Sequence, residues 1–292
     1  MTEPGGGDGP RVVALGGGHG TSVTLQAACR YAGDITAVVS VADDGGSSGR
    51  LRAAFGIPAP GDLRRCLVAL SDPNQPLARA FGHRFDSGDV EGHALGNLVI
   101  AGLTVATGSF IAALDEAGRL LGSAGRVLPA TAHPVVLKAV ADGVEIEGQV
   151  AVAQARRISS VSLVPPDAEP PGDALEAIAR ADQVVLGPGS LFTSVLAAVA
   201  VPAIGRALQA TAALKVYVCN LRPGAETDGF DVAAHVEALA AHGIEPDVVL
   251  YDPSTISGVD SQHRYVAAPL ADPHGLAHDP DRLARALAAL VG

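Results

Sequence analysis

The 292-residue sequence predicts an α/β fold: a mostly parallel open sheet flanked by helices, with a small antiparallel β excursion. Short apolar runs rich in Val, Ile and Leu alternate with Ala-rich helical stretches, which is the order expected of parallel strands covered by helices. Hydrophobic residues make up 48% of the chain and aromatic residues only 3%, so we expect a core of aliphatic side chains and alanine. The length fits one α/β domain that carries a subdomain.

Net charge and cysteine usage exclude several classes of protein. The formal charge is −11, from 20 basic and 31 acidic residues, and such a field repels nucleic acid and anionic lipid. The three cysteines form no Cys-x-x-Cys pair, which argues against a structural metal and for a reducing compartment. Residues 1–10 lack a signal-peptide pattern and are expected to be a flexible tail, and no apolar run reaches membrane-spanning length. We therefore expect a cytoplasmic protein without a nucleic-acid partner or membrane insertion.

The first element is a buried strand over residues 11–15, followed by the glycine loop 16–22 and a helix to about residue 31. Strand, glycine loop and helix form a typical phosphate site, because the helix N-terminus offers unpaired N–H groups. The Gly-Lys-Ser/Thr ending of a P-loop is absent, and Thr21 stands where G-x-G-x-x-G requires its third glycine, so a purely structural turn stays an alternative. The candidate ligand contacts here are Gly17, Gly18, Gly20 and Thr21.

A second strand, over residues 35–41, leads into two carboxylates and a loop of Gly and Ser that ends at Arg50. An acid after the second strand is where a Rossmann-type unit binds a ribose, and paired carboxylates also suit a divalent cation beside a phosphate. The alternative is a hairpin turn, which Asp-Gly often forms. The candidate ligand contacts are Asp43, Asp44, Gly46, Ser47, Ser48 and Arg50, with Asp43 and Asp44 also predicted to hold Mg²⁺ with a nucleotide.

Two helices follow, over residues 61–70 and from about residue 92 to 107. Asp62 is either an N-cap or a ligand contact, and Arg64, like Arg50, is expected to bind phosphate, since guanidinium binds phosphate in a bidentate way. Asn97 interrupts an otherwise apolar helix and is a further candidate contact. His93 is expected to be structural, and Ser47 has no evident catalytic partner in the sequence.

The middle of the chain predicts the antiparallel excursion. A helix over 111–121 precedes short strands at 126–129, 135–140, 144–146 and 158–164, with Asp142-Gly143 as a hairpin turn. We assign residues 11–292 to a single domain, with a subdomain insertion at about 122–165.

The last third returns to α/β order, with strands at 183–186, 215–219, 247–251 and 264–268 and closing helices at 232–242 and 281–291. A second strand-loop-helix site follows the first of these strands, and polar residues follow the next. Because the carboxyl ends of parallel strands share one edge, two such loops suit a ligand with two ends, such as a nucleotide carrying a second group. The candidate contacts are Gly187, Gly189, Ser190, Thr193, Asn220 and Glu226.

Together these motifs resemble the YvcK-like group of the CofD-like superfamily, whose members are called gluconeogenesis factors. The resemblance covers nearly the whole chain from residue 11. It rests on the glycine loop 16–21, the Asp-Asp-Gly-Gly-Ser-Ser-Gly-Arg block at 43–50, Pro60-Gly61-Asp62, Gly92-His93 with Gly96-Asn97, Gly187-Pro188-Gly189-Ser190, Cys219-Asn220 and Glu226-Thr227.

The resemblance implies a Rossmann-like cytoplasmic protein that binds a UDP-sugar or related nucleotide. It also implies effects on growth on gluconeogenic carbon sources, on cell shape and on peptidoglycan synthesis, without an established reaction. The relative CofD is a transferase that moves a phospholactyl group and uses a divalent metal at its acidic loop. Two departures concern the site: His19 replaces a common Thr, and residues 221–225 replace the usual Met-Thr-Gln-Pro-Gly.

The leading hypothesis is therefore a nucleotide-sugar-binding regulator without catalytic turnover, and no catalytic residue is assigned. The alternative is a divalent-metal-dependent transferase of a phospho-linked group, related to 2-phospho-L-lactate transferase. A dehydrogenase ranks third because the third glycine is missing, although NAD stays open as a bound nucleotide. A homodimer also stays open.

Overall fold

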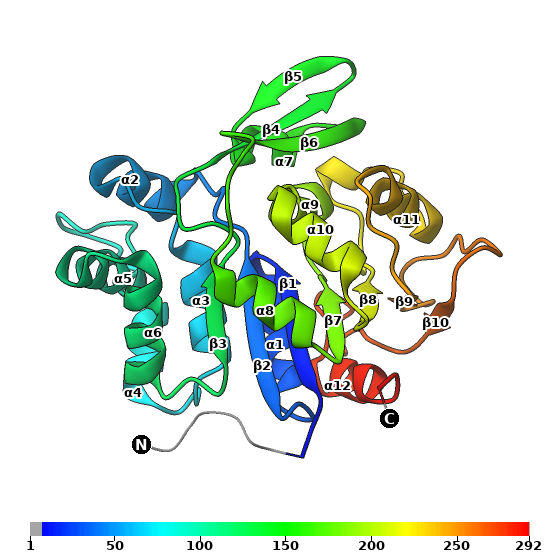
Figure 1. The fold of residues 1–292 in the computed structure, drawn as a ribbon, viewed down its shortest axis with the longest axis horizontal. Helices are drawn as coiled ribbons and strands as arrows, with labels where there is room; N and C mark the ends of the chain where they lie inside the picture. The colour runs from blue at the N-terminus through cyan, green and yellow to red at the C-terminus, as the bar shows by residue number, and fades with distance from the viewer. Residues whose placement is uncertain (1–7, 292) are drawn as a thin grey trace.

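Residues 8–291 of the computed structural model are described here, so most of the expected tail at 1–10 lies outside the described residues (Figure 1). Within them, seven strands form one parallel sheet in the order β10-β9-β8-β7-β1-β2-β3. The strands are β1 (Arg11–Gly16), β2 (Asp34–Val39), β3 (Arg126–Pro129), β7 (Gln183–Leu186), β8 (Leu214–Val218), β9 (Val248–Tyr251) and β10 (Tyr265–Ala267). The α/β fold class is confirmed.

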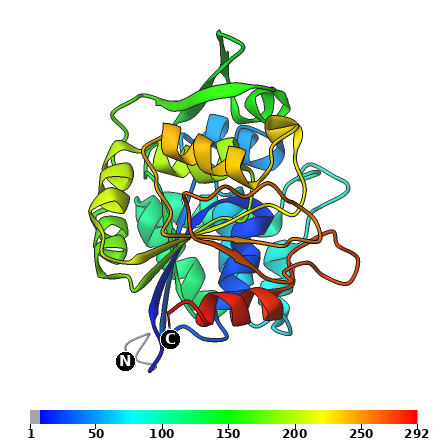
Figure 2. The same ribbon diagram turned by 90° about the vertical axis from the view of Figure 1, so that its right-hand side faces the viewer.

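Helices cover both faces of this sheet. In the side view, α8 (Gly172–Arg180) and α10 (Pro202–Ala210) lie on one side, and α1 (Gly18–Ala28) and α12 (Pro280–Ala288) lie on the other (Figure 2). The remaining helical segments are α2 (Gly46–Phe55), α3 (Gly61–Ala69), α4 (Pro76–Gly82), α5 (Leu95–Thr107), α6 (Phe110–Leu121), η1 (Leu191–Val195), α9 (Leu196–Val199), η2 (Ala225–Thr227) and α11 (Val232–Ala241). The strands between these layers are almost fully buried, and their core side chains are aliphatic residues and alanine, as the composition predicts.

The antiparallel excursion is a three-stranded sheet in the order β5-β4-β6, above the carboxyl edge of the main sheet in Figure 1. Its strands are β4 (Val136–Ala141), β5 (Val144–Glu147) and β6 (Ile158–Val164), and α7 (Gln149–Gln154) lies between β5 and β6. Asp142 and Gly143 form the expected hairpin turn, both with positive φ. The expectation was wrong at one strand: β3 pairs in parallel with β2, so it belongs to the main sheet.

A second correction concerns the Gly-Ser run after β2, which is helical from Gly46 onward. Gly46 starts α2 with φ +46°, and Ser47 to Arg50 form the first turns of this helix. The hairpin alternative is therefore wrong. The local signal was misleading because Gly and Ser have low helix propensity, which packing against α5 overrides.

Among residues 8–291, no single helix is long and apolar enough to cross a membrane. The segments Leu191–Val199 and Pro202–Ala210 are together long and apolar enough, but an 80° bend separates them.

Two histidines lie at the edge of the core, His235 fully buried and His278 partly buried. The His235 ring lies 2.8 Å from the Tyr217 hydroxyl, and His278 Nε2 lies 3.2 Å from the Cys219 carbonyl oxygen. Burial lowers the pKa of each to about 4, from an ordinary value of 6.5. In the unfolded chain both histidines take up a proton below pH 6.5, whereas the folded chain resists protonation down to about pH 4.

We therefore expect the free energy of unfolding to fall as the pH drops from 6.5 to 4, by up to about 3 kcal/mol for each histidine. The substitution His235→Gln should make this pH dependence shallower, and urea unfolding at pH 7, 6 and 5 measures it. The exposed His83→Gln is the control. Parallel pH profiles for the wild type and His235→Gln would contradict the assignment.

Candidate functional site

The centre of the carboxyl edge lies between β1 and β7, where the strand order reverses. The chain runs outward from β1 through β2 to β3 on one side, and from β7 through β8 and β9 to β10 on the other. Loops that leave adjacent strands in opposite directions open a crevice, and open α/β sheets bind ligands there. A ligand site is therefore expected at this point of the edge.

The two glycine loops meet in this crevice. A Cβ built on Gly20 would lie 2.0 Å from the Pro188 carbonyl oxygen, and one built on Gly189 would lie 3.4 Å from the Gly17 carbonyl oxygen. The Asn220 amide, from the end of β8, donates to the Gly189 carbonyl at 2.8 Å and accepts from the Gly189 N–H at 3.0 Å. Asn220 thus fixes the second loop, and the loops from β1, β7 and β8 form one unit.

The predicted contacts on these loops are accordingly brought together, in different environments. Thr21 donates to the Gly17 carbonyl at 3.2 Å, so its hydroxyl braces the first loop. Ser190 is exposed at the rim and Thr193 is buried below it. The helix α1 begins at Gly18, which leaves the N–H groups of its first turn without partners in the helix.

Asp62 reaches one of those groups. It is the second residue of α3, whose cap position is Pro60, so the N-cap interpretation is wrong. Its carboxylate accepts instead from Gly18 N–H, at the start of α1, and pairs with Arg65 at 2.5 Å. Burial and the nearby Asp43 raise the pKa of Asp62, while Arg65 and the Gly18 hydrogen bond oppose that rise. A carboxylate therefore already occupies one amide at the start of α1.

The two carboxylates after β2 diverge. Asp43 Oδ1 accepts from Gly45 N–H at 2.9 Å, and its Oδ2 lies near Gly61 together with the Ser48 hydroxyl. Asp44 turns away and accepts from Val150 N–H at 3.0 Å, at the start of α7. Asp43 therefore lies near Asp62, whereas Asp44 holds the small sheet against the main one. In the part of the chain that the structure describes, no three His, Cys, Asp or Glu side chains converge as metal ligands.

Glu226 also binds backbone amides. It accepts from Phe192 N–H at 3.3 Å, at the start of η1, and its neighbours there include Thr193 and Leu191. Burial raises the pKa of Glu226, and these hydrogen bonds oppose the rise. Glu226 thus holds the start of η1, directly after the second glycine loop, from the buried side.

Ser47, near the start of α2, has partners on α5 and just before it that the sequence did not reveal. Its hydroxyl accepts from Asn97 Nδ2 at 3.0 Å and lies 3.0 Å from His93 Nδ1. Arg50 is exposed and donates to the Glu91 carbonyl at 2.9 Å. Arg64 is buried against Gly96 of α5. Asn97, Ser47 and Arg64 therefore form a group of their own beside the crevice.

A polar cavity of about 600 Å³ continues the edge beyond Asn220. It is lined by the ends of β8, β9 and β10 and the start of α12, including Arg222, Asp252, Asp272 and Arg282. Sequence reasoning missed all of these except Arg222, which belongs to the unusual 221–225 segment. Asp252 could have indicated this cavity from the sequence. It is a polar residue directly after the apolar strand β9, in the same way that Asn220 follows the end of β8.

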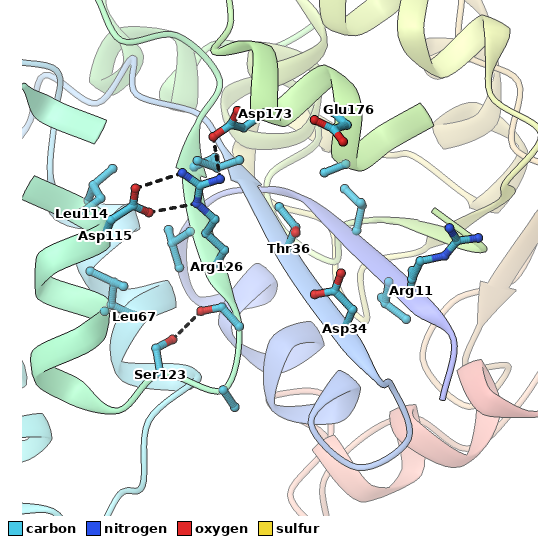
Figure 3. Close-up of a pocket in the computed structure, with 18 of the residues that line it drawn as sticks. Arg11, Asp34, Thr36, Leu67, Leu114, Asp115, Ser123, Arg126, Asp173 and Glu176 are labelled. Atoms are coloured by element: carbon cyan, nitrogen blue, oxygen red, sulfur yellow. Dashed lines mark hydrogen bonds and ion pairs between the residues drawn. The ribbon is translucent and has the colours of Figure 1, made fainter. Parts of the chain in front are cut away.

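A larger groove, of about 720 Å³, lies elsewhere, at the amino ends of β1, β2 and β3 between α6 and α8 (Figure 3). Its charged side chains neutralise each other: Arg126 lies 2.9 Å from Asp115 and 2.6 Å from Asp173. Both glycine loops lie at the opposite end of these strands. The groove is therefore a weaker candidate than the carboxyl edge.

Comparisons with known proteins agree with this architecture. The profile of the CofD family, described as 2-phospho-L-lactate transferase CofD, matches residues 12–288. A gluconeogenesis factor of Halalkalibacterium halodurans is 44% identical over 247 residues, which cover 82% of this chain and 77% of that protein. The gluconeogenesis factor of Bacillus subtilis is also 44% identical, over 80% of this chain and 75% of its own length. A crystal structure of a UPF0052 family member from Bacillus halodurans superposes with a TM-score of 0.90, at 37% identity, over 97% of this chain and 99% of its own.

The family profile spans almost all of the described residues, and the relatives align over most of their own length. The chain therefore belongs to the CofD family and, within it, to the proteins named gluconeogenesis factors.

Proposed function

We propose that this protein is a cytoplasmic regulator that binds a UDP-sugar at the carboxyl edge of its sheet. Growth on gluconeogenic carbon sources, cell shape and peptidoglycan synthesis are the processes it would affect. The names of its relatives support the first of these. Binding, without turnover of the nucleotide sugar, is then the activity.

One observation carries the proposal: Asn220 joins the glycine loops, and the next residue, Leu221, lines a polar cavity of about 600 Å³ at the same edge of the sheet. Ligand sites of this size class hold nucleotide-sized molecules. Asp62 takes the Gly18 N–H, so a diphosphate would use the amides of His19 and Gly20 and the rim at Ser190. The cavity, with Arg222 and Arg282, would take the other end of the ligand.

We expect calorimetric titration with UDP-N-acetylglucosamine to show binding that Asn220→Ala weakens about tenfold to a hundredfold, because the Gly189 loop loses both of its hydrogen bonds to that side chain. Gln209→Ala is the matched control. Gln209 lies on α10, and its amide side chain donates to the Gly243 carbonyl, so this variant also removes an amide hydrogen bond to a glycine. UMP and NAD serve as comparison ligands. Equal affinities for the wild type and Asn220→Ala, or stronger binding of NAD than of the UDP-sugar, would contradict the proposal.

A second candidate function is a divalent-metal-dependent transfer of a phospho-linked group. Two features favour it: Asp43 and Asp62 lie near each other beside the glycine loop, and the matching family is described by a transferase name. Carboxylate oxygens there would bind Mg²⁺, which neutralises a departing diphosphate. Mg²⁺-dependent consumption of the UDP-sugar that disappears in Asp43→Asn, but persists in Asp34→Asn at the other end of β2, would support the transferase. Recovery of unchanged ligand after incubation with Mg²⁺ would support the regulator.

A further inference from the structure

Arg64 is a buried cation to which the described residues give no anion. Among residues 8–291 it is the one buried arginine, 7% exposed, and its guanidinium makes neither an ion pair nor a hydrogen bond with any of them. Burying an unpaired charge is costly, and proteins usually compensate with a partner. In a chain with net charge −11, such an exception needs an explanation.

The Arg64 and Asp62 side chains leave α3 on opposite sides. On a helix, residues two apart point to opposite sides. Asp62 reaches toward Gly17 and Gly18 on α1, whereas the Arg64 stem lies on α5, where a Cβ at Gly96 would come 2.8 Å from Arg64 Cγ. The Arg64 stem therefore packs on the α5 side of α3, while its charge, in addition to burial, helps to lower the pKa of His19 in the first glycine loop.

Other buried or partly buried polar groups lie on that side of α3. Asn97, 1% exposed, donates to Ser47, and Ser47 lies 3.0 Å from the His93 ring. The Asn97 Oδ1 atom and the Arg64 Nε atom have no hydrogen-bond partner among the described residues. These groups come from α2, α3, α5 and the segment before α5, so four parts of the chain converge here.

Two further cations stand at the mouth of this group. Arg50 donates to the Glu91 carbonyl and Arg84 to the Gly92 carbonyl, and neither forms an ion pair within the described part of the chain. Burial lowers the pKa of His93 most, and the positive charges of Arg50 and Arg84 lower it further. Both guanidiniums therefore lie near the His93 ring. The local field is therefore positive although the whole protein is acidic.

We propose that Arg64, Asn97 and the Ser47–His93 pair, with Arg50 and Arg84 at the mouth, form a binding site for a phosphoryl group, separate from the nucleotide crevice. A phosphate provides the anion that Arg64 lacks and accepts the planar pair of N–H groups that a guanidinium presents. The phosphoryl group has two conceivable sources: a free phosphorylated metabolite or the diphosphate of the nucleotide ligand. The packing of the Arg64 stem on α5, and not on the glycine loops, favours the free metabolite. This inference goes beyond the proposed function and does not require it to be correct.

The test is titration calorimetry with inorganic phosphate, in a phosphate-free buffer. We expect wild-type protein to bind phosphate, Arg64→Gln to weaken binding at least tenfold, and Arg79→Gln to leave it unchanged. Arg79 is exposed on α4 and controls for the loss of one positive charge. No phosphate binding by the wild type, or equal affinities for the wild type and Arg64→Gln, would overturn the proposal.

Asn97→Asp is the second variant, because it nearly preserves shape and therefore tests the site even if Arg64→Gln does not fold. Its added carboxylate repels phosphate, so binding should fall at least tenfold; unchanged binding would overturn the proposal. Repeating the wild-type titration with saturating UDP-N-acetylglucosamine distinguishes the two sources. Unchanged phosphate affinity supports a separate site, whereas competition would assign Arg64 to the nucleotide's own diphosphate and overturn the separation. Failure of the UDP-sugar to bind would contradict the proposed function alone.

Discussion

Replacement of Gly20 by alanine is expected to destabilise the protein by about 3–5 kcal/mol. The added Cβ would lie 2.0 Å from the carbonyl oxygen of Pro188 and 2.4 Å from its carbonyl carbon. Both atoms belong to the backbone of the second glycine loop, which Asn220 and Thr24 hold in place through hydrogen bonds. Because both clashing atoms are backbone, no flexible side chain can move aside. The clash can be relieved only if the two loops separate between β1 and β7, where the strand order reverses.

Urea unfolding followed by circular dichroism measures this loss, since the chain has no tryptophan. Gly102→Ala is the matched control: Gly102 lies in α5 with open space where its Cβ would be, so alanine there should stabilise by up to about 1 kcal/mol. If folded Gly20→Ala protein is recovered, it should also bind a UDP-sugar more weakly. Equal stability of Gly20→Ala and wild type would mean that the two loops are not in contact.

The second large effect is expected at Asp252, a buried carboxylate at the end of β9. It accepts hydrogen bonds from Leu270 N–H at 2.7 Å, from Ala271 N–H at 2.9 Å, and from both the N–H and hydroxyl of Ser254. Burial alone would raise the pKa of Asp252, but these hydrogen bonds outweigh it and lower the pKa to about 2. The carboxylate thus joins β9 to the segment before α12 and forms a wall of the polar cavity.

Asp252→Asn should cost about 3 kcal/mol at pH 7, because the amide presents a donor to N–H groups that need an acceptor. The folded pKa of about 2 lies below the ordinary value of 3.8, so this stabilisation is complete above pH 4 and is lost as the pH falls toward 2. The difference between variant and wild type should therefore shrink in acid. Unfolding curves at pH 7, 4 and 3 check both statements, with the exposed Asp34→Asn as control. A pH-independent difference would contradict a role for the charged carboxylate.

Local sequence patterns predicted the elements of the main sheet well. Strands β1, β2, β7 and β8 lie within about two residues of the expected runs, because buried parallel strands are continuous apolar segments that end in polar loops. The antiparallel hairpin followed from Asp142-Gly143, whose turn is encoded by adjacent residues. The strand β3 was misplaced because a four-residue run does not reveal which strand it will pair with.

The roles of the carboxylates were harder to predict. Asp62, Glu226 and Asp44 were all expected to contact a ligand, yet each accepts from the start of another helical segment: α1, η1 and α7, respectively. A carboxylate that binds a phosphate-bound cation and one that caps a distant helix look the same in sequence. The choice depends on amides more than thirty residues away.

The sequence by itself determined the α/β class, the glycine loops and the family, because these depend on short-range periodicity and on motifs of adjacent residues. Only the tertiary structure decided which groups meet. It joined Ser47 to His93 and Asn97, 46 and 50 residues away, left Arg64 buried without a partner among residues 8–291, and gave Asp43 and Asp44 different amide partners. The reason is physical: hydrogen bonds and charge pairs form between side chains that packing brings together, and that packing is a property of the whole sheet.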